Sequence, residues 1–161
     1  MDMDELREQA AAAFRALDVP NELTLDSLRQ LLEEDRGKEI VVRSVSHLGR
    51  DQISGLWFSL PSTDLILHAE TASALHREQI ILHEFAHMAL NHERLMGSED
   101  HLASLLPDLN PAMVSRCLAR CKRQSEPEIV AESLADLFAG ALARTRRAGR
   151  VEPGNFRGVF G

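Results

Sequence analysis

The chain has 161 residues, of which 44% are hydrophobic and 27% charged, a composition typical of a globular protein with one domain over residues 1–161. A formal net charge of −7 argues against a direct nucleic-acid-binding surface, and the absence of Tyr argues against stacking on single-stranded bases. The start, Met1 to Glu5, is acidic and no apolar stretch approaches a membrane span, so we expect a cytoplasmic protein with no membrane partner.

Two amphipathic helices are predicted within residues 3–36. In the first, from about residue 3 to 17, apolar side chains recur at helical spacing. The second follows Thr24, a favourable N-cap, and ends at Gly37. The apolar stripe of the first helix consists of Leu6, Ala10, Phe14 and Leu17.

Residues 39–69 change to a β pattern. The segments 39–46, 53–60 and 64–68 are short and rich in β-branched and aromatic residues, and turn-forming residues separate them. We therefore expect a three-stranded antiparallel meander. With the helices, this predicts an α+β domain that is mainly helical and whose small sheet packs on the helix that follows.

The helix expected at 73–91 carries the most informative motif, an HExxH sequence that runs from His83 through Glu84 to His87. Residues four apart lie on one face of a helix, so both imidazoles can bind one metal ion. Glu84 lies on the flank of this face, where it can accept a proton from the attacking water without being a ligand. The surrounding residues are apolar, so we expect the helix to be buried on nearly every side.

A hydrolytic zinc site takes three protein ligands and keeps one position for water. We expect the third ligand on a helix at 125–146, which carries Glu128, Glu132 and Asp136 on one side. In one register Glu128 binds the metal and Glu132 supports a ligating histidine; in the other, Glu132 binds and Asp136 supports. Geometry alone favours neither register.

Three further segments accompany the motif, and together they resemble the ImmA/IrrE family of metallopeptidases. They are Arg77–Leu82 directly before the motif, Leu56-Trp57-Phe58 before the last strand, and Leu106–Pro111 between the two site helices. The resemblance extends from about Leu25 to Leu142. It implies a zincin-like fold, a zinc cofactor and a glutamate as third ligand.

The family pattern Glu-x-x-Ala-Glu-x-x-Ala falls on residues 128–135, which favours Glu128 as ligand and Glu132 as its support. Relatives often carry a Tyr before this helix, and Arg123 stands about where it would be. Without that Tyr, the candidate donors to a developing oxyanion are His76, Arg123 and His68. The strand 65–68 is either a core strand or an edge strand that pairs with an extended substrate.

The sequence therefore predicts a zinc-dependent endopeptidase. Similarity to the family implies a specific protein substrate, such as a helix-turn-helix transcriptional regulator, and the acidic charge fits a protein partner better than DNA. The alternative is a zinc-stabilised interaction module with little or no proteolytic activity. In a third possibility, the motif lies by chance on a core helix that binds no metal.

Overall fold

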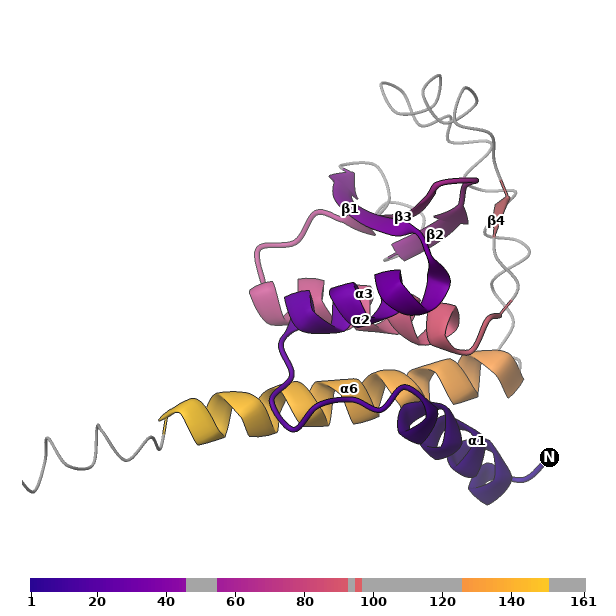
Figure 1. The fold of residues 1–161 in the computed structure, drawn as a ribbon, viewed down its shortest axis with the longest axis vertical. Coiled ribbons are helices and arrows are strands. Elements are labelled where there is room, and N and C mark those ends of the chain that lie inside the picture. Colours follow the sequence, from indigo (N-terminus) through magenta and orange to yellow (C-terminus); the bar gives the residue numbers. More distant parts are fainter. Residues whose placement is uncertain (46–54, 93–94, 97–125, 151–161) are drawn as a thin grey trace, which may run out of the picture.

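The computed structural model describes residues 1–45, 55–92, 95–96 and 126–150, which form an α+β protein (Figure 1). Helices α1 (Met3–Ala16) and α2 (Leu25–Arg36) are followed by strands β1 (Glu39–Val45), β2 (Gly55–Ser59) and β3 (Thr63–Ala69). Helix α3 (Ala74–Ala89), the two-residue strand β4 (Leu95–Met96) and the long helix α6 (Glu126–Arg150) complete the described elements.

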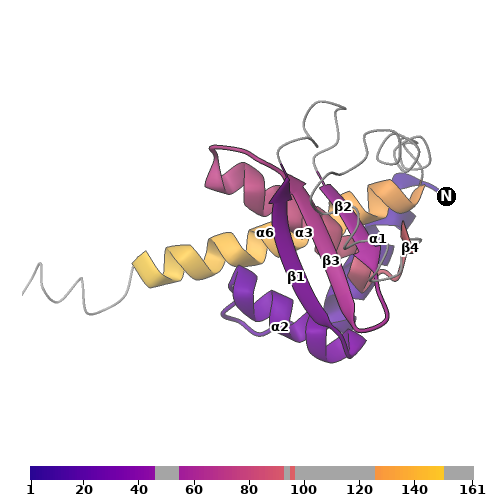
Figure 2. The same ribbon diagram turned by 90° about the horizontal axis from the view of Figure 1, so that it is seen from above.

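These elements are stacked in layers. Helices α2 and α3 lie side by side against one face of the sheet, and α6 crosses α3 on the side away from the sheet (Figures 1 and 2). Helix α1 packs along α6. The main core lies between the layers, where Trp57, Ile66, Phe85 and Phe138 are at most 4% exposed. Helix α3 is thus held between the sheet and α6.

The predicted N-terminal helices are confirmed. Leu6 and Ala10 of the predicted stripe are buried, and Phe14 and Leu17 pack against the same core. Thr24 caps α2 in a reciprocal capping box with Ser27, and Gly37 ends that helix in the left-handed conformation that glycine adopts at no steric cost.

The predicted antiparallel meander is wrong. The strand order is β1-β3-β2-β4: β1 is parallel to β3, and β2 is antiparallel to it. Strands β2 and β3 do form a hairpin, closed by a 2.8 Å bond from the Leu60 N–H to the Thr63 carbonyl. The segment 46–54, however, is longer than the roughly two to five residues of a hairpin loop. This length allows β3 to lie between β1 and β2.

Strand β3 occupies the centre because it is apolar on both faces. Ile66 belongs to the main core, whereas Leu65 and Leu67 belong to a second buried cluster with Leu56 and Phe58 on the opposite face of the sheet. Strands β1 and β2 pair with β3 along its two edges. The prediction that strand 65–68 offers an edge to substrate is therefore wrong, and that of a core strand is confirmed.

A buried ion pair connects the layers at the end of α2. The Arg36 guanidinium pairs with Asp64 of β3, and the Trp57 indole N–H of β2 donates to the same carboxylate at 3.0 Å. Arg36 also donates to the carbonyl of Met88 in α3 at 3.4 Å. Because the Asp64 side chain is 0% exposed, these partners replace the water that a surface carboxylate would bind.

Two features named in the sequence analysis lie outside the described residues, the Leu106–Pro111 segment and Arg123. Within the described part of the chain, no helix combines the length and the apolar character needed to cross a membrane.

Candidate metal centre

Helix α3 begins after Ser73, whose hydroxyl accepts a hydrogen bond from the backbone N–H of His76 at 3.2 Å. The expectation that this helix is buried on nearly every side is wrong for its first turn, where Leu75, His76 and Arg77 are exposed. Burial starts at Ile80, where the helix passes beneath the sheet. The HExxH motif lies in this second half, so buried residues of the helix flank it on both sides in the sequence.

The two motif histidines meet a carboxylate from α6. The Nε2 atoms of His83 and His87 lie 3.2 Å apart. One oxygen of Glu128 lies 3.1 Å from the Nε2 of His83, and its other oxygen lies 3.1 Å from the Nε2 of His87. The packing of α3 on α6 thus brings Glu128 to the two histidines, although it follows His83 by 45 residues in the sequence.

The donor set and its spacing fit a zinc ion. Tetrahedral zinc with ligand bonds of about 2.0–2.1 Å separates neighbouring ligand atoms by roughly 3.3 Å. The two imidazole nitrogens are 3.2 Å apart, close to this value, and each lies 3.1 Å from a different oxygen of Glu128. With one ligand atom taken from each residue, all three atoms lie within 4.8 Å of one another. Two imidazole nitrogens with one carboxylate form a common hydrolytic ligand set. The side chains of His83 and Glu128 are each 34% exposed, so solvent reaches the cluster.

The charges of the cluster are strongly coupled. Burial alone would raise the pKa of Glu128, but its hydrogen bonds with His83 and His87 outweigh burial and lower the pKa to about 2. Burial disfavours the charged form of His83, but the contact with Glu128 and the nearby Glu84 prevail and raise its pKa. The metal-free cluster therefore favours a carboxylate beside a protonated imidazole.

Glu84 lies behind the histidines, between α3 and the sheet. It is 8% exposed. Burial raises the pKa of its carboxyl, and the neighbouring His87 and His83 oppose this shift only in part. A Cβ atom placed on Gly55 of β2 would lie 3.2 Å from one Glu84 oxygen. The small residue at the start of β2 thus makes room for the carboxylate.

His92 is a site residue that sequence reasoning missed. Its Nδ1 lies 2.9 Å from the Nδ1 of His87, on the side of the ring opposite the Nε2 that faces Glu128. The chain returns there because Asn91 adopts a left-handed conformation, with φ of 53°. The N–H groups of His92 and Asn91 then bond to the carbonyls of His87 and Met88, each at 3.0 Å. An Asn directly after a helix is a sequence signal for this cap.

The other predicted residues lie apart from this cluster. Glu132 and Asp136 are exposed on α6, although the charge of Glu132 contributes to the raised pKa of His83. His76 is exposed in the first turn of α3, with its Nδ1 3.4 Å from the Thr71 hydroxyl. His68 is buried at the end of β3. The structure brings Glu128, rather than Glu132, to both imidazoles.

Comparison of the chain with protein-family models, with curated proteins and with solved structures finds no match.

Proposed function

We propose that this protein is a zinc-dependent endopeptidase with a zincin-like site, related to the ImmA/IrrE metallopeptidases. The observation that supports this function best is the meeting of the His83 and His87 ring nitrogens with the Glu128 carboxylate, all within 4.8 Å of one another. An HExxH motif on a core helix without a metal would not require a distant carboxylate to contact both imidazoles.

Each group in the cluster has a role in peptide hydrolysis. Zinc held by His83, His87 and Glu128 would act as a Lewis acid that polarises the scissile carbonyl and activates water. Glu84 acts as the general base, because its raised pKa brings it closer to the pH at which a carboxylate both accepts and returns a proton. It receives the proton of the attacking water and passes it to the leaving amine. His92 accepts the Nδ1–H of His87 and fixes the orientation of that ring.

The substrate class follows from the resemblance and from the charge. We infer a protein substrate, in particular a helix-turn-helix transcriptional regulator. The net charge of −7 is more favourable for a protein partner than for nucleic acid.

The metal assignment is tested by measuring zinc bound to the purified protein and to two variants. Glu128→Ala removes a ligand and should abolish stoichiometric zinc. Glu132→Ala, the matched change one turn along α6, should retain zinc with an affinity at most about 10–100-fold weaker. Loss of zinc from Glu132→Ala alone, or from neither variant, would contradict the assignment.

The catalytic assignment is tested with Glu84→Gln, which keeps the shape of the side chain but removes the base. We expect this variant to bind zinc normally and to cleave a helix-turn-helix regulator about 10²–10⁴-fold more slowly than the wild type. Unchanged cleavage would exclude Glu84 as the base.

A second candidate function is a zinc-stabilised interaction module. The chain contains no Tyr, and neither of the described donor candidates, His76 and His68, contacts the metal cluster. If wild type and Glu84→Gln regulate their partner equally and neither produces fragments, this second function is the correct one.

A further inference from the structure

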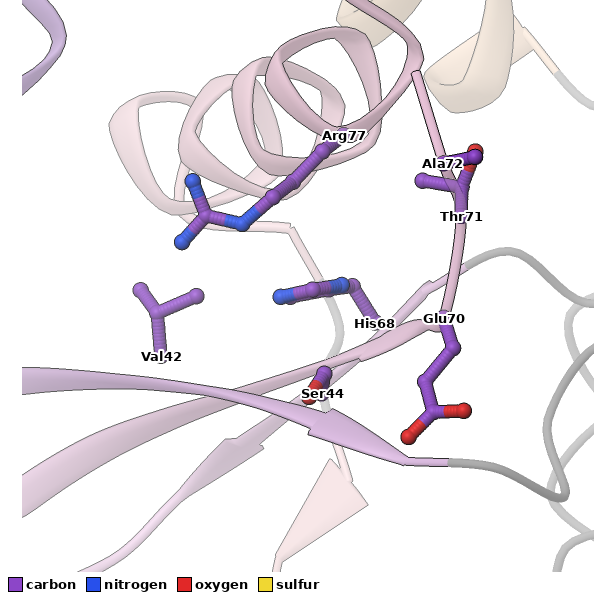
Figure 3. Close-up of a pocket in the computed structure, with 7 residues that line it drawn as sticks. All are labelled: Val42, Ser44, His68, Glu70, Thr71, Ala72 and Arg77. Atoms are coloured by element: carbon purple, nitrogen blue, oxygen red, sulfur yellow. The ribbon is translucent and has the colours of Figure 1, made fainter. Parts of the chain in front are cut away.

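A cavity separate from the metal cluster lies where β1 and β3 end and α3 begins. Its volume is about 620 Å³, within the range of small-molecule sites. Figure 3 shows that the ring of His68 and the guanidinium of Arg77 point into the same space, with Val42 on the opposite side. Arg77 precedes the ligand His83 by six positions, roughly 9 Å along a helix axis. The cavity is thus distinct from the proposed catalytic site.

The buried imidazole of His68 presents an acceptor to this cavity. His68 is 3% exposed, and its Nδ1 lies 3.0 Å from the backbone carbonyl of Ala69. A carbonyl oxygen only accepts hydrogen bonds, so Nδ1 carries a proton, and in the Nδ1–H tautomer the Nε2 is an acceptor. Among the described residues, none bonds to Nε2. A buried ring nitrogen of this kind is stabilised by a ligand that donates to it.

Two positive groups lie at the cavity, the guanidinium of Arg77 and the N-terminus of α3, and no ion pair within the described residues neutralises Arg77. The first turn of α3 also contains no acidic residue, in contrast to α1 and α2. Glu70 also borders the cavity, but its carboxylate points away from Arg77 and His68 in Figure 3. The guanidinium and the helix N-terminus together favour a bound anion.

We propose that this cavity binds a small carboxylate that carries an O–H or N–H donor on the carbon next to the carboxyl group. The planar guanidinium of Arg77 matches a carboxylate in a bidentate arrangement, and the donor reaches the Nε2 of His68. The exposed hydroxyl of Ser44 and the apolar side chain of Val42 line the remainder of the cavity. Phosphate binds less well, because its greater negative charge is unfavourable beside Glu70.

The experiment is a set of amide NMR titrations of the zinc-loaded protein with lactate, acetate and inorganic phosphate at constant ionic strength. Lactate should give saturable shifts centred on Ser44, Thr71 and Arg77, and should bind more tightly than acetate or phosphate. Shifts centred on His83 and His87 instead would show anion binding to the metal and would overturn the proposal.

Variants assign the two recognition groups. Arg77→Met should weaken lactate binding by about tenfold or more, whereas Arg147→Met, which removes an exposed charge on α6, should leave it unchanged. His68→Phe should abolish the preference for lactate over acetate. If no anion gives saturable shifts, if phosphate binds more tightly than lactate, or if Arg77→Met binds lactate like wild type, the proposal is wrong. The first titration and the Arg77 variant decide the outcome even if His68→Phe fails to fold.

Discussion

Gly55 shows how one residue of the sheet determines the position of the proposed base. A Cβ atom at this position would lie 2.8 Å from the Cγ2 of Ile80 and 3.2 Å from the Oε1 of Glu84. Both contacts are to side chains of α3, so any larger residue at the start of β2 pushes against the motif helix. The close approach of β2 to α3 therefore requires glycine at position 55.

Gly55→Ala should destabilise the fold by about 1–3 kcal/mol, because an added methyl group overpacks this contact. It should also lower peptidase activity while zinc binding is retained, since Glu84 is displaced but is not a ligand. Denaturant unfolding and zinc analysis measure the two effects. Gly149→Ala is the control: its Cβ would meet nothing within 4 Å, so we expect no loss of stability. Equal stability of the two variants would contradict the prediction.

The motif residues could be predicted from the sequence because helical spacing is a local property. His83 and His87 share a face through their separation of four residues alone. The choice between Glu128 and Glu132 depends on how α6 is rotated against α3, which the spacing of the carboxylates does not determine; only the resemblance to the family pattern favoured Glu128. His92 was missed for a similar reason: its position next to His87 depends on the left-handed turn at Asn91.

At the scale of elements, the helices were easier to predict than the pairing of the strands. The stripe on α1 and the caps of α2 are local signals, and both are confirmed. The pairing of strands, by contrast, depends on contacts between residues that are far apart in the sequence. The short apolar runs indicated three strands, but the central position of β3 follows from the burial of both its faces, as the residues on either side of Ile66 show.

The Arg36–Asp64 pair connects three elements, so its loss should affect the whole fold. Asp64→Ala removes the partner of a guanidinium whose side chain is only 10% exposed and leaves the Trp57 N–H without this acceptor. We expect a loss of about 3–5 kcal/mol in the free energy of unfolding. Glu8→Ala, which breaks an exposed pair with Arg15, should cost less than about 1 kcal/mol. Thermal and urea unfolding compare the two, and similar losses would refute the structural role of the buried pair.

At the scale of the whole molecule, the proposed zinc ion joins α3 to α6 and should stabilise the fold. Ligand binding to the folded state raises the free energy of unfolding by about 2.7 kcal/mol at 100 times Kd. We therefore expect chelation to lower Tm in the wild type but not in Glu128→Gln. The same decrease in both proteins would place the stabilising metal elsewhere.

The stabilisation by zinc should grow with pH. In the metal-free protein, the raised pKa of His83 adds stability below its usual value of 6.5, and this stability is lost as the pH rises through the raised value. Glu128 adds stability above 4.5, which is lost as the pH falls toward its folded value of about 2. Zinc competes with the proton on His83, so the increase in Tm should be larger at alkaline than at mildly acidic pH. Melting curves with zinc or chelator across this range test the trend, and a constant increase would contradict it.

The 45-residue separation between His83 and Glu128 has a consequence for biosynthesis. A ribosome that has completed the HExxH helix has not yet made the carboxylate that completes the zinc-binding group. The incomplete nascent chain therefore lacks the full cluster and cannot hydrolyse neighbouring polypeptides by the mechanism proposed for the finished protein.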